Sequence, residues 1–142
     1  MKTSKEQLTS ILKTTQMGQI GIRSVMDYAI NDSLKKELKS QLREYDMIEQ
    51  EANEIASLRG WEIQQLDPAT KLMSKVMART NLSMGNTDSR IATMMINGNT
   101  RGMIKSLKNQ HHGNQSDLRV RRLGEKLLDY ETANIRQMQG YL

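Results

Sequence analysis

Few residues of this 142-residue sequence have the chemistry of a catalytic site. There is no cysteine, which excludes thiolate catalysis, disulfides and cysteine-based metal sites. The only two histidines, His111 and His112, are adjacent, and neither has an evident catalytic partner. No Gly-x-Ser-x-Gly motif is present. We therefore expect no catalytic residues and no cofactor, and we favour a protein that is not an enzyme.

Basic residues are concentrated in the second half of the chain. Residues 71–126 contain 11 lysines and arginines against three acids, a net charge of +8. The cluster expected at the turn between the last two helices comprises Lys105, Lys108, Arg119, Arg121, Arg122 and Lys126. Such a patch could bind nucleic acid or an anionic surface. Because no DNA-binding motif is present and stacking aromatics are scarce, we favour a solvated basic end and keep nucleic-acid binding as an alternative.

Apolar residues recur every three or four positions along four segments, which predicts four long helices. One proline in the whole chain agrees with this interpretation. The expected helical segments are 4–29, 34–60, 87–112 and 116–142. The expected N-caps are Ser4 in a capping box with Gln7, then Asp32 or Ser33, then Thr87 or Asp88, and finally Ser116 or Asp117.

A long connection separates the second helix from the third. Residues 61–88 contain Asp67 and Pro68, an N-cap followed by proline at the first helical position, which predicts one short helix there. The connections before and after this one are short, so each flanking pair of helices forms a hairpin. The expected fold is a single all-α domain over residues 1–142, a four-helix bundle with the long crossover of ferritin-like proteins.

A weak internal repeat is consistent with two similar hairpins. Residues 38–46 align with residues 123–131, so that Leu38 corresponds to Leu123 and Tyr45 to Tyr130. A duplicated helical hairpin would leave such a trace.

The first hairpin also carries a family resemblance. Residues 8–18 and 31–38 resemble the bacterial ferritin-like proteins of the rubrerythrin/ferritin superfamily, and Arg59-Gly60-Trp61 is similar to the end of the second helix in spore-coat-type relatives. This resemblance implies a four-helix bundle. It also implies a di-iron centre with one Glu from each of two helices and Glu-x-x-His from each of the other two.

The ligands of such a centre are missing from this sequence. Gln16 stands where a core Glu is expected, and residues 89–112 contain no carboxylate. Glu49 and Glu131 are each followed three positions later by a residue other than His. We therefore expect no di-iron centre. The alternative is a metal-binding, ferroxidase-like protein with an unorthodox site, for which the candidate ligands are Asp46, Glu49, Asp129 and Glu131.

Uncharged and cationic residues are expected where the metal would lie. Gln16, Arg101 and Asn134 are the candidates for a buried polar layer, with Arg101 supplying positive charge. A buried Arg needs carboxylate partners, which Glu49, Glu131 or Asp46 would provide. The opposite interpretation places these polar residues on solvated faces.

Two glycines within the third helix need a packing reason, since each costs roughly 1 kcal/mol there. We expect Gly98 and Gly102 to allow a close approach to the first helix at Thr15, Gly18 and Gly21. Most of the 11 methionines are interpreted as core filler. The expected core comprises Leu8, Ile11, Ile22, Leu38, Leu42, Tyr45, Ile48, Ile55, Ile91, Met95, Leu123, Leu127 and Tyr130.

Apolar residues in the crossover suggest self-association. Trp61, Ile63, Leu66, Leu72 and Val76 are more than one short helix normally needs, which predicts a homodimer or a larger assembly. No apolar run approaches the roughly 20 residues of a membrane span. The polar residues 1–7 lack the apolar core of a signal peptide, so we expect a cytoplasmic location. The favoured function is structural or associative, and the resemblance implies a coat- or stress-related component.

Overall fold

The computed structural model describes residues 1–67, 82, 85–114 and 116–142. Four long helices make up most of this part: α1 (Ser4–Val25), α2 (Asp32–Arg59), α4 (Thr87–His111) and α5 (Leu118–Gln139). A 3₁₀ turn, η1 (Met26–Tyr28), follows α1. The described residues form no strand beyond one isolated bridge between Lys2 and Gly113. The predicted all-α fold of four helices is confirmed.

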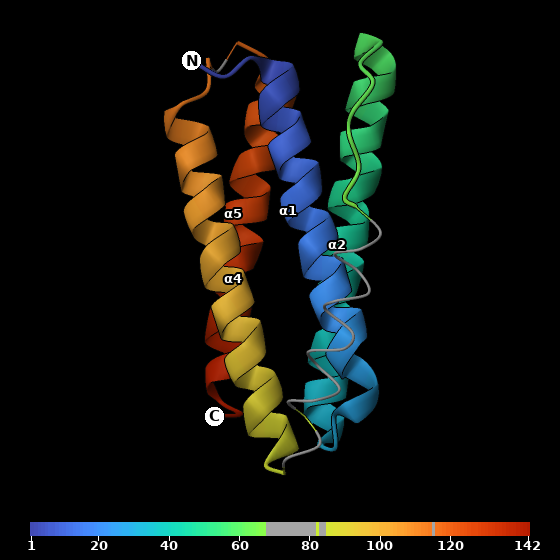
Figure 1. Cartoon of the computed structure of the whole chain (residues 1–142), viewed down its shortest axis with the longest axis vertical. Coiled ribbons are helices and arrows are strands. Elements are labelled where there is room, and N and C mark those ends of the chain that lie inside the picture. The colour runs from blue at the N-terminus through green and yellow to red at the C-terminus, as the bar shows by residue number, and fades with distance from the viewer. Residues whose placement is uncertain (68–81, 83–84, 115) are drawn as a thin grey trace.

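The helices form a bundle of two antiparallel pairs, as Figure 1 shows. α1 packs against α2 and α4, and α5 packs against α4 and α2. α2 ends at the end of the bundle that holds the N-terminus, whereas α4 begins at the opposite end, so α2 and α4 run in the same direction. Residues 60–86 join them, and the short helix predicted after Asp67 lies outside the described residues.

Local sequence signals explain most of the helix ends. Gly60 closes α2 in the left-handed conformation, with φ of 68°, as its position predicts. Asp117 caps α5 by accepting hydrogen bonds from the backbone N–H groups of Arg119 and Val120. Both ends agree with the sequence-based expectations.

The other three caps differ from expectation. Thr3, one residue before Ser4, caps α1 and accepts a hydrogen bond from the backbone N–H of Glu6. Asn31, one residue before Asp32, caps α2. Both replacements have short oxygen-bearing side chains that cap as well as the residues expected, so local chemistry did not decide between neighbours.

Asp88 has a tertiary role in place of the predicted cap. α4 begins after Asn86, whose side chain makes no capping bond. The Asp88 carboxylate instead accepts hydrogen bonds from the backbone N–H groups of Ile30 and Asn31, at 2.8 and 2.9 Å. It therefore fastens the start of α4 to the turn between α1 and α2.

The core lies along the axis of the bundle. Eleven of the thirteen residues expected there are buried, and Leu42 and Tyr130 are only partly buried. Both lie on α2 or α5 beside the buried stripe, at positions where apolar spacing alone cannot set the rotation of the helix. The buried apolar residues not anticipated include Leu12, Val25, Leu34, Ala52, Ala92, Val120 and Met138.

The start of the connection covers the bundle to which it belongs. Trp61 and Ile63 pack against the core, and Leu66 is half-buried. The Leu66 backbone N–H donates to Oε1 of Gln16, and Nζ of Lys13 donates to Gln64. Because Trp61, Ile63 and Leu66 cover their own bundle, they are weak evidence for self-association. Leu72 and Val76 lie outside the described residues. The homo-oligomer stays a prediction.

None of the helices among the described residues has an apolar stretch long enough to cross a membrane.

Candidate functional site

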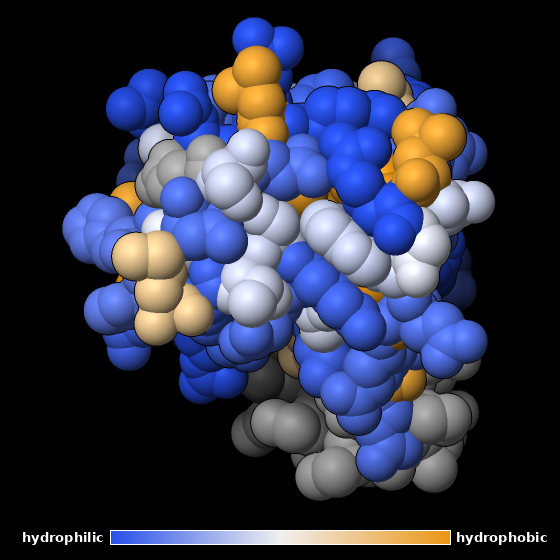
Figure 2. Space-filling model, turned by 90° about the horizontal axis from the view of Figure 1, so that it is seen from above, coloured by the Kyte–Doolittle hydropathy of each residue, from blue (hydrophilic) through white to orange (hydrophobic). Residues whose placement is uncertain are grey.

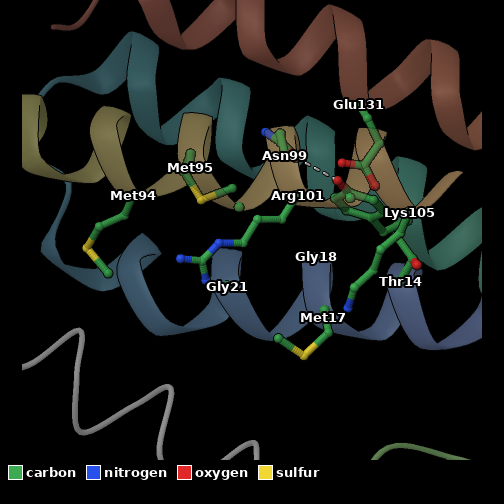
Figure 3. A pocket seen from close by; sticks show the side chains of 13 residues that line it. Thr14, Met17, Gly18, Gly21, Met94, Met95, Asn99, Arg101, Lys105 and Glu131 are labelled. Atoms are coloured by element: carbon green, nitrogen blue, oxygen red, sulfur yellow. Dashed lines mark hydrogen bonds between the residues drawn. The ribbon is translucent and has the colours of Figure 1, made fainter. Parts of the chain in front are cut away.

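A cavity of about 240 Å³ lies inside the bundle, with its mouth between α1 and α4 (Figure 3). α2 and α5 each contribute one described side chain to its lining, Tyr45 and Glu131. α1 and α4 contribute the rest, among them Gly18, Gly98 and Asn99. A concave site with a few converging polar groups in a mostly apolar wall is the usual form of a small-molecule site.

Tyr45 forms one half of the cavity floor. Its side chain is 1% exposed, and its hydroxyl donates a hydrogen bond of 2.9 Å to Oδ1 of Asn99. The ring fits because Gly18 faces it: a Cβ on Gly18 would lie 2.5 Å from Cζ of Tyr45. Burial, and then the nearby Glu131, raise the pKa of Tyr45. The hydroxyl therefore stays protonated and holds Asn99 in place.

Glu131 forms the other half of the floor. The residue is 2% exposed, and burial raises the pKa of its carboxyl to about 8. Gly102 makes room for it, since a Cβ there would lie 2.6 Å from Cδ of Glu131. Within the described part of the chain the carboxyl has neither a hydrogen bond nor an ion pair. A carboxyl that is 2% exposed and has no partner among the described residues is unusual.

Two buried amides surround the floor. Asn134 is fully buried beside Tyr45, and neither its nitrogen nor its oxygen has a hydrogen-bond partner of good geometry among the described residues. Nδ2 of Asn99 is also without one. The site therefore keeps more hydrogen-bonding capacity than its own residues use.

The mouth of the cavity is cationic and rich in methionine. Arg101 and Lys105, one turn apart on α4, extend across it toward α1 in Figure 3. Met17, Met94 and Met95 line the wall around them. Neither cation forms an ion pair within the described part of the chain.

The predicted polar layer is correct only in part. Asn134 lies in the core, but Arg101 is exposed and pairs with none of Glu49, Glu131 or Asp46. A guanidinium loses less free energy at the mouth, where water solvates it, than in the core.

Gln16 is the other misplaced member of that layer. It is half-buried on the outer side of α1, where its Nε2 donates to Glu49 at 3.2 Å and also to Gln65. It therefore links α1 and α2 to the start of the long connection. Tyr45 lies in the core as expected, and Glu131 faces the interior without the Arg101 partner expected for it.

The four acids proposed as metal ligands do not converge. Asp46 accepts from Gln19 at 2.8 Å and lies 3.6 Å from Arg23, and Glu49 is bound by Gln16 as described above. Asp129 is exposed, so only Glu131 faces the interior. No group of three His, Asp or Glu side chains suited to a metal ion exists among the described residues. This donor set does not fit the di-iron centre that the resemblance implies.

The predicted basic patch is divided between faces. Arg119 lies 3.7 Å from both Glu51 and Glu54 on α2, and Arg121 pairs with Glu125 at 3.4 Å. Lys105 and Lys108 instead line a shallow groove with Lys13 and Glu6 of α1 and with Lys2, which precedes α1. Arg122 and Lys126 lie on α5, away from that groove. The basic surface is thus a face of α1 and α4, because α4 turns its lysines away from α5.

Figure 2 looks onto the end of the bundle that holds the N-terminus. Hydrophilic residues cover most of it, with isolated apolar side chains among them. The Arg59 guanidinium meets the Asp117 carboxylate at this end, at 2.8 Å. Charged groups of both signs are therefore mixed here.

None of the glycines expected to bring α1 and α4 together makes room for the opposite helix. A Cβ on Gly98 or Gly21 would meet no atom within 4 Å, and Gly102 makes room for Glu131 and not for α1. The predicted role of these glycines in a close approach is wrong, because Gly21 and Gly98 border open space at the cavity and Gly18 makes room for the Tyr45 ring. One sequence signal for the site was present: Glu131 occupies a core position between Leu127 and Asn134 in the seven-residue spacing of α5.

Comparison with known proteins bears on the fold alone. No protein-family model matches this chain, and no curated protein matches it. A solved structure, the crystal structure of a DUF305 fragment from Deinococcus radiodurans, is similar with a TM-score of 0.75, over 96% of this chain and 93% of that chain. The two sequences are 10% identical, so the likeness defines a shared all-helical class of fold.

Proposed function

We propose that this protein is a non-catalytic binding protein that holds a small molecule in the cavity between α1 and α4. The observation that carries the proposal is Glu131, a carboxyl 2% exposed at the cavity floor with no hydrogen-bond partner in the described part of the chain. Burying such a group without a partner costs free energy of folding. A ligand that supplies the partner would recover that cost on binding.

The chemistry of the cavity favours binding over catalysis. The Tyr45 hydroxyl donates a hydrogen bond to Asn99, and burial raises its pKa, so it is a poor nucleophile. Glu131 is the only carboxyl among the described residues of the lining, and no histidine stands beside it. This supports the associative role that the sequence suggested.

The proposal includes the finer part of the fold. We assign residues 60–86 as the long crossover of a ferritin-like connectivity, supported by the parallel directions of α2 and α4. A coat- or stress-related role and a cytoplasmic location remain parts of this hypothesis. Self-association also remains a prediction, and light scattering at tens of micromolar measures it: a monomer mass would contradict it.

Methyl NMR tests the proposal directly. The three methionines of the cavity wall, Met17, Met94 and Met95, report on occupancy in a protein labelled at its methionine methyl groups. Titration with a set of neutral and charged fragments should shift these three resonances saturably. Met47 on α2, 54% exposed and outside the cavity lining, is the internal control.

Two variants sharpen this test. Gly98→Leu places a side chain in open space at the cavity mouth and should abolish the shifts while the protein stays folded. Glu131→Leu should raise the free energy of unfolding and lose binding, because an apolar side chain removes the unpaired carboxyl. The proposal fails if no fragment shifts the three methyl groups, or if the shifts persist in Gly98→Leu.

A further inference from the structure

Resting on the proposed function, we infer that the ligand is a small organic carboxylate whose anionic group lies between Arg101 and Lys105. Its apolar body would lie along the methionine wall, with a neutral hydrogen-bond acceptor toward Glu131. Three features of the cavity lead to this class of ligand: the charge at the mouth, the character of the wall, and the protonation of the floor.

The mouth selects for an anion. Arg101 and Lys105 both line the cavity and lie one helical turn apart, so a single anionic group can bind both. Four arginines of the described chain, Arg23, Arg59, Arg119 and Arg121, have acidic partners. Arg101 and Lys105 have none there, and the groove next to Lys105 adds three lysines, Lys2, Lys13 and Lys108, against one acid, Glu6. A guanidinium forms charge-assisted hydrogen bonds to a carboxylate in a fixed, paired geometry.

The wall selects for a small apolar body. Met17, Met94 and Met95 present flexible, polarizable side chains, and Gly18 and Gly98 leave flat surface between them. The cavity of about 240 Å³ is smaller than the roughly 300–1,000 Å³ of drug-sized sites. A single ring or a short branched chain therefore fits better than a nucleotide or an oligosaccharide.

The floor selects against a cation. Burial raises the pKa of Glu131 to about 8, so its carboxyl is mainly protonated at neutral pH and donates a hydrogen bond. An organic amine would have to pass Arg101 and Lys105 and then ionise Glu131. An anion gains attraction at the mouth, and its far end gains a hydrogen bond from the neutral carboxyl. Both the mouth and the floor of the cavity therefore favour binding of an anion over binding of an amine.

Three probes of matched shape test the charge class: benzoate, benzamide and benzylamine. Each is titrated into full-length protein, with the methyl resonances of Met17, Met94 and Met95 as the readout at pH 7. We expect benzoate to bind at least about tenfold more tightly than benzylamine, with benzamide between them. Equal binding of benzoate and benzylamine, or tighter binding of benzylamine, would overturn the inference.

Charge variants test the mouth. Arg101→Gln and Lys105→Gln should each weaken benzoate binding about fivefold or more and leave benzamide binding nearly unchanged. Lys39→Gln on α2 makes the same change in net charge on an exposed residue outside the cavity and should have no effect. Benzoate binding that is insensitive to both mouth variants would contradict the assignment of its carboxylate.

The outcomes separate this inference from the function on which it rests. If benzamide or any other fragment shifts the three methyl groups and benzoate does not, the cavity binds a small molecule but not an anion. If no probe and no fragment shifts them, both the ligand class and the proposed function are wrong.

Discussion

The carboxylate of Glu131 lies where a side chain on Gly102 would have to be. The same relationship joins Tyr45 to Gly18 in the other hairpin, where the ring of the tyrosine fills the space beside the glycine. In each hairpin, a glycine of the first helix thus admits a polar side chain of the second helix to the bundle interior. The two side chains meet at the floor of one cavity, which makes the site a product of both hairpins.

Gly18 should tolerate no side chain. In Gly18→Ala the new Cβ would lie 2.5 to 2.8 Å from three ring atoms of Tyr45, which is 1% exposed and cannot move without cost. We expect a loss of about 1–3 kcal/mol in the free energy of unfolding. Gly21→Ala, one turn along α1 and with nothing within 4 Å, should gain about 0.5–1 kcal/mol from helix propensity. Urea denaturation compares them, and a stabilised Gly18→Ala protein would contradict the packing described here.

Glu131 should make the protein less stable as the pH rises. Its pKa is about 8 in the folded protein against an ordinary value of 4.5. Between these values the unfolded chain has lost the proton that the folded protein keeps. The free energy of unfolding therefore falls by up to about 1.4 kcal/mol per pH unit between the two pKa values. The contribution of Glu131 to stability is complete below the pKa of the unfolded chain and is lost above the pKa of the folded protein.

Chemical denaturation between pH 5 and pH 9 measures this slope. Glu131→Gln keeps the shape of the side chain without the titration, so the variant should lack that part of the pH dependence. A constant difference between wild type and Glu131→Gln across the range would show that Glu131 does not titrate as described.

Asp117 combines two stabilising roles that substitution can separate. It caps α5 and binds Arg59 at 2.8 Å, and the hydrogen bond from Arg59 holds the pKa of its carboxyl below the usual range. Asp117→Ala should cost about 1–2 kcal/mol through the lost cap alone. Asp117→Asn keeps a good cap and loses only the ion pair, at most about 1 kcal/mol. Thermal or urea unfolding that finds both variants equally destabilised would contradict this division.

Asp88 should contribute more to the free energy of unfolding than its partly exposed position suggests. Asp88→Ala leaves the backbone N–H groups of Ile30 and Asn31 without their acceptor, at a cost of about 1–3 kcal/mol. Asp88→Asn keeps one acceptor oxygen and should fall between Ala and wild type. Asp32→Ala, whose side chain is 95% exposed, is the matched control and should change stability by less than about 0.5 kcal/mol. Equal losses of stability in Asp88→Ala and Asp32→Ala would contradict the tertiary role of Asp88.

The internal repeat shows where sequence reasoning stops. The alignment of residues 38–46 with residues 123–131 pairs Tyr45 with Tyr130. In the structure Tyr45 is buried and Tyr130 only partly so, and Glu131 takes the interior position that corresponds to Tyr45. The residue that aligns with Tyr45 and the residue that is buried in its place are thus neighbours, one position apart. Adjacent residues on a helix point about 100° apart, and packing sets the rotation of each helix.

The sequence by itself determined the number and kind of the helices and two of their ends, at Gly60 and Asp117, because apolar period and capping chemistry act over a few neighbouring residues. Only the tertiary structure decided which polar groups face the interior. It buried Glu131, left Arg101 at the cavity mouth, and left open space beside Gly98. Those outcomes depend on how each helix turns against its neighbours, a balance of packing and desolvation over all four helices that no local window contains.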